Sequence, residues 1–205
     1  SKKDDIHMYE CDVDGYTYNK EEIRLSESNQ KLCAIQYIVL YNDCNVAYVG
    51  IKDKVAEGSV TERIDHRILT LTRENNKVNK VLVVFTLRKI RDENPDAFNH
   101  FQLLCEGMLQ KSISKDYEIE TRHKKLSIQA LNEHSIKSNG LHEKYIDIIG
   151  DRLRTHLVNI LIKLGMVNKI KSLTLNSIPS DTVGIPTVPT VPTIPTIPTI
   201  PTIPT

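Results

Sequence analysis

The sequence predicts an α+β fold, in which a small three-stranded antiparallel sheet is flanked by helices and followed by a helical carboxy-terminal extension and a disordered proline-rich tail. Two runs of β-branched and aromatic residues, 35–41 and 46–51, flank the turn formers Asn42-Asp43-Cys44-Asn45 and predict a hairpin. A third run, Val78 to Leu87, is too continuously apolar for a surface helix and indicates a central strand buried on both faces. Helical periodicity surrounds this third strand, which gives the α+β class.

One helix is predicted on each side of the third strand. Before it, the run 60–71 has an apolar residue every three or four positions, and Ser59 and Glu62 have the spacing of a capping box. After it, Asn94-Pro95-Asp96 opens a second helix. The apolar stripe of this second helix comprises Phe98, Phe101, Leu104, Cys105 and Met108.

The region 118–165 is predicted to be helical, with a break at Ser138-Asn139-Gly140. Beyond the break, apolar residues form a face about six turns long. They are Leu141, Tyr145, Ile148, Ile149, Leu153, Leu157, Ile160 and Leu164. Such a face needs a partner, and the sequence leaves two open: the domain itself, or a homodimer through the 141–164 helix.

The two ends of the chain differ from this central region. Asp14-Gly15, between Met8 and Tyr18, predicts a further hairpin. Eight of the nine prolines fall in the last 27 residues, where (Ile/Val)-Pro-Thr repeats from Ile185 onward and predicts a disordered tail. We therefore divide the chain into an amino-terminal segment 1–32, a compact domain 33–117, a helical extension 118–170 and a tail 171–205.

Composition excludes several classes of protein. With 27 Lys+Arg against 26 Asp+Glu, the chain as a whole is neither a basic nucleic-acid-binding polymer nor an acidic tail. No window approaches about 18 uninterrupted apolar residues, and the first residues lack a signal-peptide core, so we expect no membrane association. Four scattered cysteines without Cys-x-x-Cys spacing indicate reduced thiols in an intracellular protein, cytoplasmic or nuclear.

Basic residues are concentrated in one stretch. Residues 50–91 contain ten Lys+Arg and five Asp+Glu. This excess suits a phosphate backbone, and the candidate DNA contacts are Lys52, Lys54, Arg67 and Arg73. An ordinary charged surface is the plain alternative.

Five residues that carry chemistry follow the predicted elements in order. They are Tyr37, Tyr48, Arg63, His66 and Glu106. The tyrosine hydroxyls come from paired strands, the arginine fork fits a phosphate, and a carboxylate suits Mg²⁺. The plain alternatives are packing tyrosines, a solvated helix face and a carboxylate at the edge of the core.

The arrangement resembles the GIY-YIG nuclease superfamily over residues 33–112. Tyr48-Val49-Gly50 matches the second motif, and Tyr37 precedes Tyr48 by eleven residues. The resemblance implies a DNA endonuclease dependent on Mg²⁺ or Mn²⁺, with the metal on Glu106 and a structural glycine at Gly50. It also implies that an arginine, Arg63, contacts the phosphate oxygens, and that a tyrosine or His66 acts beside the scissile phosphate.

The sequence departs from the family pattern at three points. Ile35 stands where the first motif has glycine, the stretch from Gly50 to Arg63 is longer than usual, and no asparagine follows Glu106 at the usual distance. Two alternatives therefore stay open. One is a catalytically degenerate module that binds nucleic acid, and the other is a structural or interaction protein that uses the 141–164 helix and the tail.

Overall fold

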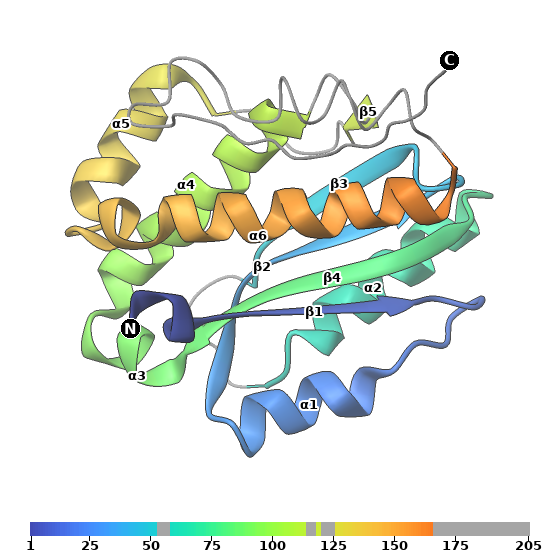
Figure 1. Cartoon of the computed structure of the whole chain (residues 1–205), viewed down its shortest axis with the longest axis horizontal. Coiled ribbons are helices and arrows are strands. Elements are labelled where there is room, and N and C mark those ends of the chain that lie inside the picture. Colours follow the sequence, from blue (N-terminus) through green and yellow to red (C-terminus); the bar gives the residue numbers. More distant parts are fainter. Residues whose placement is uncertain (53–57, 114–117, 120–125, 166–205) are drawn as a thin grey trace, which may run out of the picture.

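The computed structural model describes residues 1–52, 58–113, 118–119 and 126–165 (Figure 1). The strands form one sheet in the order β1-β4-β2-β3-β5. Their bounds are Ile6–Asp12 for β1, Leu32–Tyr41 for β2, Val46–Gly50 for β3, Val78–Leu87 for β4 and Glu118–Ile119 for β5. The first four strands pair antiparallel, and the two residues of β5 pair parallel to β3. The α+β class is confirmed.

The number of antiparallel strands is four, not three, because the amino-terminal segment joins the sheet. β1 pairs with β4 from Ile6 opposite Thr86 to Asp12 opposite Lys80. The turn at Asp14 forms, with a bridge to Thr17, but the chain then enters α1 (Lys20–Ser28) instead of a second arm. The predicted turn is therefore present, while the residues after it do not continue as a second strand. Since β4 is apolar on both faces, it lies inside the sheet and needs a neighbour on each side, which β1 supplies.

The hairpin and the central strand are confirmed. β2 and β3 pair from Tyr37 opposite Gly50 to Tyr41 opposite Val46. Between them Asn42, Asp43 and Cys44 all have positive φ, which asparagine and aspartate tolerate best. β4 has the predicted bounds and lies between β1 and β2.

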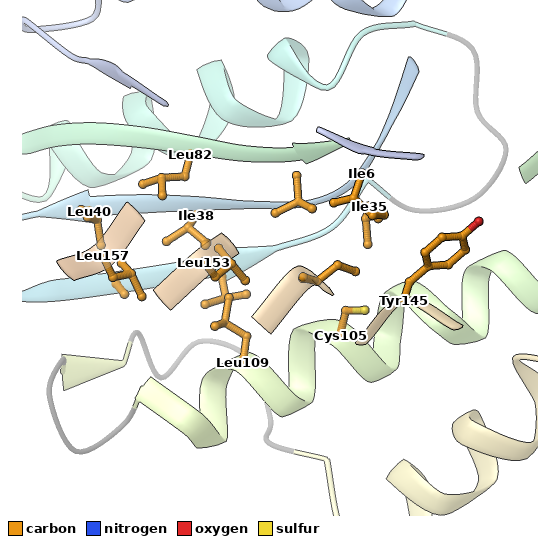
Figure 2. Close-up of a cluster of buried hydrophobic side chains, with 14 of the residues drawn as sticks. Ile6, Ile35, Ile38, Leu40, Leu82, Cys105, Leu109, Tyr145, Leu153 and Leu157 are labelled. Atoms are coloured by element: carbon orange, nitrogen blue, oxygen red, sulfur yellow. The ribbon is translucent and has the colours of Figure 1, made fainter. Parts of the chain in front are cut away.

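Helices cover both faces of the sheet (Figure 1). α1 and α2 (Thr61–Arg73) cover one face, where Ile23, Ile64 and Ile68 pack against the sheet. α4 (Pro95–Ile113) and α6 (Leu141–Lys163) cover the other, where Ile38 and Leu82 of the sheet belong to the same buried cluster as Cys105 and Leu153 of these helices, and Figure 2 shows Ile38 beside Leu153. There are also two short helices. η1 (Lys2–Asp5) precedes β1, and α3 (Arg88–Glu93) follows β4.

The start of α2 is stabilised by Ser59, as predicted, and by a second group that was not predicted. The Ser59 hydroxyl accepts from the Thr61 amide at 3.1 Å and donates to the Glu27 carboxylate of α1, while the reciprocal contact of the predicted box with Glu62 is not formed. The Val60 amide donates to the same Glu27 carboxylate at 3.0 Å. A side chain distant in sequence therefore satisfies one of the free amides, which no local pattern reveals.

The long apolar face of α6 packs on the domain's own sheet. Tyr145, Ile149, Leu153 and Leu157 are buried there, and the Tyr145 hydroxyl donates to Asp5 at 2.7 Å. The first of the two alternatives is thus the one the structure adopts, and this face is not available for the expected homodimer. The break before α6 is confirmed, with Gly140 at φ +86°.

The rest of the extension differs from the sequence prediction. Residues 118–119 form β5 instead of helix, and α5 (Ile128–Lys137) precedes the break. The proline-rich tail lies outside the described residues. All four cysteines are free thiols. Within the described part of the chain, no helix has the length and apolar character needed to cross a membrane.

Candidate active site

A pair of tyrosines on the β2–β3 hairpin forms the centre of the candidate site. The ring centroids of Tyr37 and Tyr48 lie 6.0 Å apart with the planes tilted by 35°. Gly50 lies opposite Tyr37, and a Cβ atom there would fall 2.6 Å from Tyr37 Cζ and Oη and 2.8 Å from Tyr48 Cε1. Glycine is therefore required at position 50 by the tyrosine pair itself, and not only as the last residue of β3.

Arg67 of α2 completes this group. Its guanidinium carbon lies 4.0 Å from the centroid of the Tyr48 ring, and its Nη2 donates to the Tyr48 hydroxyl at 3.1 Å. Arg67 Nε is buried and makes no hydrogen bond to the described residues. The guanidinium is thus fixed by stacking while one of its donors is unused.

The arginine that contacts the tyrosine pair is Arg67, whereas the sequence predicted Arg63 for the phosphate. Arg63, the residue expected to hold the phosphate, is exposed one turn before Arg67 on the same face of α2. Its positive charge acts on Tyr37, which places it within electrostatic reach of the pair. Arg67, expected only as a DNA contact, makes the direct contacts.

Both tyrosine hydroxyls are held in the protonated form. Burial raises the pKa of Tyr37, and so do the neighbouring Tyr48 and a hydrogen bond to it. Burial also raises the pKa of Tyr48, against the opposing charge of Arg67. At neutral pH the two hydroxyls therefore act as hydrogen-bond donors, and neither is a ready phenolate base.

Glu106 reaches the same region from the helix on the other face. Gln102, one turn earlier on α4, donates from Nε2 to the carbonyls of Ala34 and Ile35, both at 3.2 Å, and of Lys52 at 3.4 Å. This holds one side of α4 against the ends of β2 and β3, and Glu106 lies on that side. Its negative charge contributes to the raised pKa of Tyr48.

Few groups near the tyrosines could hold a metal ion. Among the described residues, no group of three or more His, Cys, Asp and Glu side chains could hold a metal. Mg²⁺ needs no such group, because it keeps several waters and takes one or two carboxylates together with substrate phosphates. Glu106 is a carboxylate of this kind, whereas a zinc site would need three or four protein ligands.

The remaining predicted residues are not gathered at this point. His66 is exposed on α2, and its side chain makes no hydrogen bond to the described residues. Arg73 is exposed at the carboxy-terminal end of the same helix. Lys54 lies outside the described residues.

A basic cleft at the start of β2, lined by Leu32, Cys33 and Ala34 among others, was not predicted from the sequence. It has a volume of about 510 Å³, and its lining includes four cations and one carboxylate. They are Arg24, Lys52, Arg88, Arg91 and Glu27. Only Lys52 was predicted as a contact. Arg88 and Arg91 belong to the basic stretch 50–91, but neither was singled out within it. Arg24 lies in the amino-terminal segment 1–32, outside the predicted compact domain.

Comparison of this chain with protein-family models, with curated proteins and with solved structures finds no match in any of the three.

Proposed function

We propose that this chain is a metal-dependent DNA endonuclease of the GIY-YIG type, which hydrolyses phosphodiester bonds. The observation that carries the proposal is the contact group of Tyr37, Tyr48 and Arg67 closed over Gly50. Packing tyrosines alone would not require an arginine stacked on one ring. Because Arg67 Nε is buried, a phosphate oxygen would meet the terminal nitrogens of this guanidinium, whose planar fork suits a phosphate.

Each residue of the site would have a separate role in phosphodiester hydrolysis. Arg67 donates to the non-bridging oxygens of the phosphate, where negative charge develops as water attacks phosphorus. The protonated hydroxyls of Tyr37 and Tyr48 add hydrogen bonds to the same region and orient the attacking water. Hydrolysis moves one proton from this water and delivers one to the leaving ester oxygen. Glu106 would hold Mg²⁺, which when bound supplies positive charge and lowers the pKa of water.

The role of Glu106 is tested by cleavage of supercoiled plasmid with and without Mg²⁺ or Mn²⁺. We expect metal-dependent nicking by the unmodified chain and a loss of at least about 100-fold in the Glu106→Gln variant, as for removal of a group that stabilises the transition state. Glu143→Gln, on the exposed side of α6, is the matched control. Equal rates for Glu106→Gln and the control would remove Glu106 from the mechanism.

A catalytically degenerate module that binds nucleic acid is the second candidate. It is favoured by the β-bulge between Ala34 and Gln36, where Ile35 takes the place of the family's glycine and is fully buried in the core. This bulge changes the alternation of side chains just before Tyr37. DNA binding that depends on Arg67, without cleavage in any metal, would support this candidate over the first.

A further inference from the structure

The basic cleft lies where three helices meet the ends of β2 and β3. α1 contributes Arg24 and Glu27, α3 contributes Arg88 and Arg91, and Lys52 follows β3. Leu32 and Phe98 supply apolar lining. The volume of about 510 Å³ is sufficient for a small ligand or for one nucleotide of a strand.

The arginines of the cleft are positioned by contacts to the described residues. Arg88 donates to the backbone carbonyl of Glu27, and Arg91 pairs with the exposed Asp92 through Nε at 3.1 Å and Nη2 at 3.0 Å. Arg24 donates from Nε to the Thr61 hydroxyl at 3.3 Å and pairs with Glu21 at 3.2 Å. Because a guanidinium carries five N–H donors, these contacts to the described residues do not use all the donors of any of the three.

Positive charge is in excess in the cleft. Among the described residues of the lining, Glu27 is the one carboxylate, and it already accepts hydrogen bonds from Ser59 and Val60 at the start of α2. Burial lowers the pKa of Lys52, while the carboxylates of Glu27 and Glu62 raise it and the charges of Arg91 and Arg63 lower it to a lesser extent. An anion in the cleft would add a further partner for these cations.

The cleft adjoins the candidate active site along the chain. Lys52 follows Gly50 by two residues, and Ala34, which also lines the cleft, precedes Tyr37 by three residues on β2. The charge of Arg63 acts on both Lys52 and Tyr37. Positive groups at both places suit the repeating charge of a nucleic-acid backbone better than an isolated small anion.

We propose that the basic cleft is a second phosphate-binding site, which holds the DNA strand on one side of the phosphate bound at Arg67. The identity of the strand as DNA depends on the proposed function. The binding of its phosphate depends on the cleft alone. One wall is α1, which lies before the region 33–112 that carries the family resemblance, so this site would belong to this chain in particular.

Binding is measured apart from cleavage, by fluorescence anisotropy of a labelled DNA duplex in EDTA across a series of salt concentrations. The test variant is the double substitution Lys52→Gln and Arg91→Gln. We expect about tenfold weaker binding and a salt dependence lowered by about one to two phosphate contacts. The control, Lys89→Gln with Lys137→Gln, removes the same charge from exposed positions outside the cleft and should bind like the unmodified chain.

Three outcomes decide the proposal. Equal affinities for the test and control variants overturn it. The proposal is also overturned if the test variant keeps its affinity for DNA but no longer binds a nucleoside monophosphate that the unmodified chain binds. The cleft would then be a small-molecule site. Weaker DNA binding by the single variant Arg91→Gln, whose pairing with exposed Asp92 contributes little to folding, would support it even where the double variant unfolds.

The cleft and the nuclease can fail separately. If the chain binds DNA through the cleft but does not cut it, the nuclease proposal is wrong and the phosphate-site proposal stands. If the chain cuts DNA and the cleft variants bind and cut like the unmodified chain, the phosphate-site proposal is wrong and the nuclease proposal stands.

Discussion

Gly50 lies where two aromatic rings leave no room for a methyl group. We expect Gly50→Ala to displace the Tyr37 ring and to lower the free energy of unfolding by about 1–3 kcal/mol, as overpacking does. The variant should also lose cleavage, because the tyrosine pair moves. Thermal unfolding followed by circular dichroism measures the first effect, and plasmid nicking the second.

Gly150 provides the matched control for that substitution. It lies within α6, and a Cβ atom there would meet nothing within 4 Å. Gly150→Ala should therefore raise stability by about 0.5–1 kcal/mol, the usual preference of a helix for alanine. Equal shifts for the two substitutions would show that the contacts around Gly50 are not tight.

Gln36 is fully buried beside Tyr37, and neither atom of its amide makes a hydrogen bond to the described residues. An unsatisfied buried amide is unfavourable, so Gln36→Met should leave stability unchanged or raise it by roughly 1 kcal/mol. Gln102→Met, which removes a buried amide that donates to three carbonyls, should instead lower stability by about 1–3 kcal/mol. Chemical denaturation of the two variants compares them, and a large destabilisation by Gln36→Met would contradict the account.

At the residue scale, sequence reasoning found the type of each group but not always the position. Helical spacing places Arg63 and Arg67 on one face of α2, and only the packing of α2 against β3 determines that Arg67 reaches Tyr48. The orphaned amide of Gln36 has no sequence signature at all, because it depends on a β-bulge.

At the scale of elements, α5 and α6 carry histidines that affect stability through pH. Burial lowers the pKa of His142, and burial and the charge of His100 lower the pKa of His134. Their pKa values in the folded state therefore lie below the usual value of about 6.5. As pH falls below about 6.5, the unfolded chain takes up protons first, so stability should fall between this pH and the lowered pKa values.

This expectation is checked by the melting temperature between pH 7.5 and 5. The double variant His134→Gln and His142→Gln should show a flatter dependence on pH than the unmodified chain. His66→Gln, at an exposed position on α2, controls for the loss of a histidine as such. An unchanged slope in the double variant would exclude these two residues as its source.

Elements with a strong periodic pattern were predicted well, and those fixed by distant contacts were not. The bounds of β4 and the opening of α4 at Pro95 follow from local composition. β1 was not placed in the sheet, because its pairing with β4 joins residues 68 to 80 positions apart, and β5 has only two residues. The same limit hid the contact of Glu27 with the start of α2.

At the scale of the whole molecule, the amino-terminal strand β1 and the carboxy-terminal helix α6 both pack into the same sheet-centred domain. β1 adds a strand to one edge of β4, while α6 covers the face between β1 and β2, with Leu153 and Leu157 in its core (Figure 2). The amino-terminal segment also supplies α1, which forms a wall of the basic cleft. Truncation to the region of family resemblance would therefore remove part of the core and part of the cleft together.

The arginine that stacks on Tyr48 gives the most direct test of the central claim, which is that DNA is cut at the group of Tyr37, Tyr48 and Arg67. The measurement is the single-turnover rate of plasmid nicking by Arg67→Ala in Mg²⁺, beside Arg73→Ala at the exposed end of the same helix. The account predicts a loss of at least about 100-fold for Arg67→Ala and a change within about twofold for Arg73→Ala. An active Arg67→Ala variant would contradict the account. If Arg63→Ala lost cleavage and Arg67→Ala did not, the phosphate contact would be made by Arg63, as expected from the sequence.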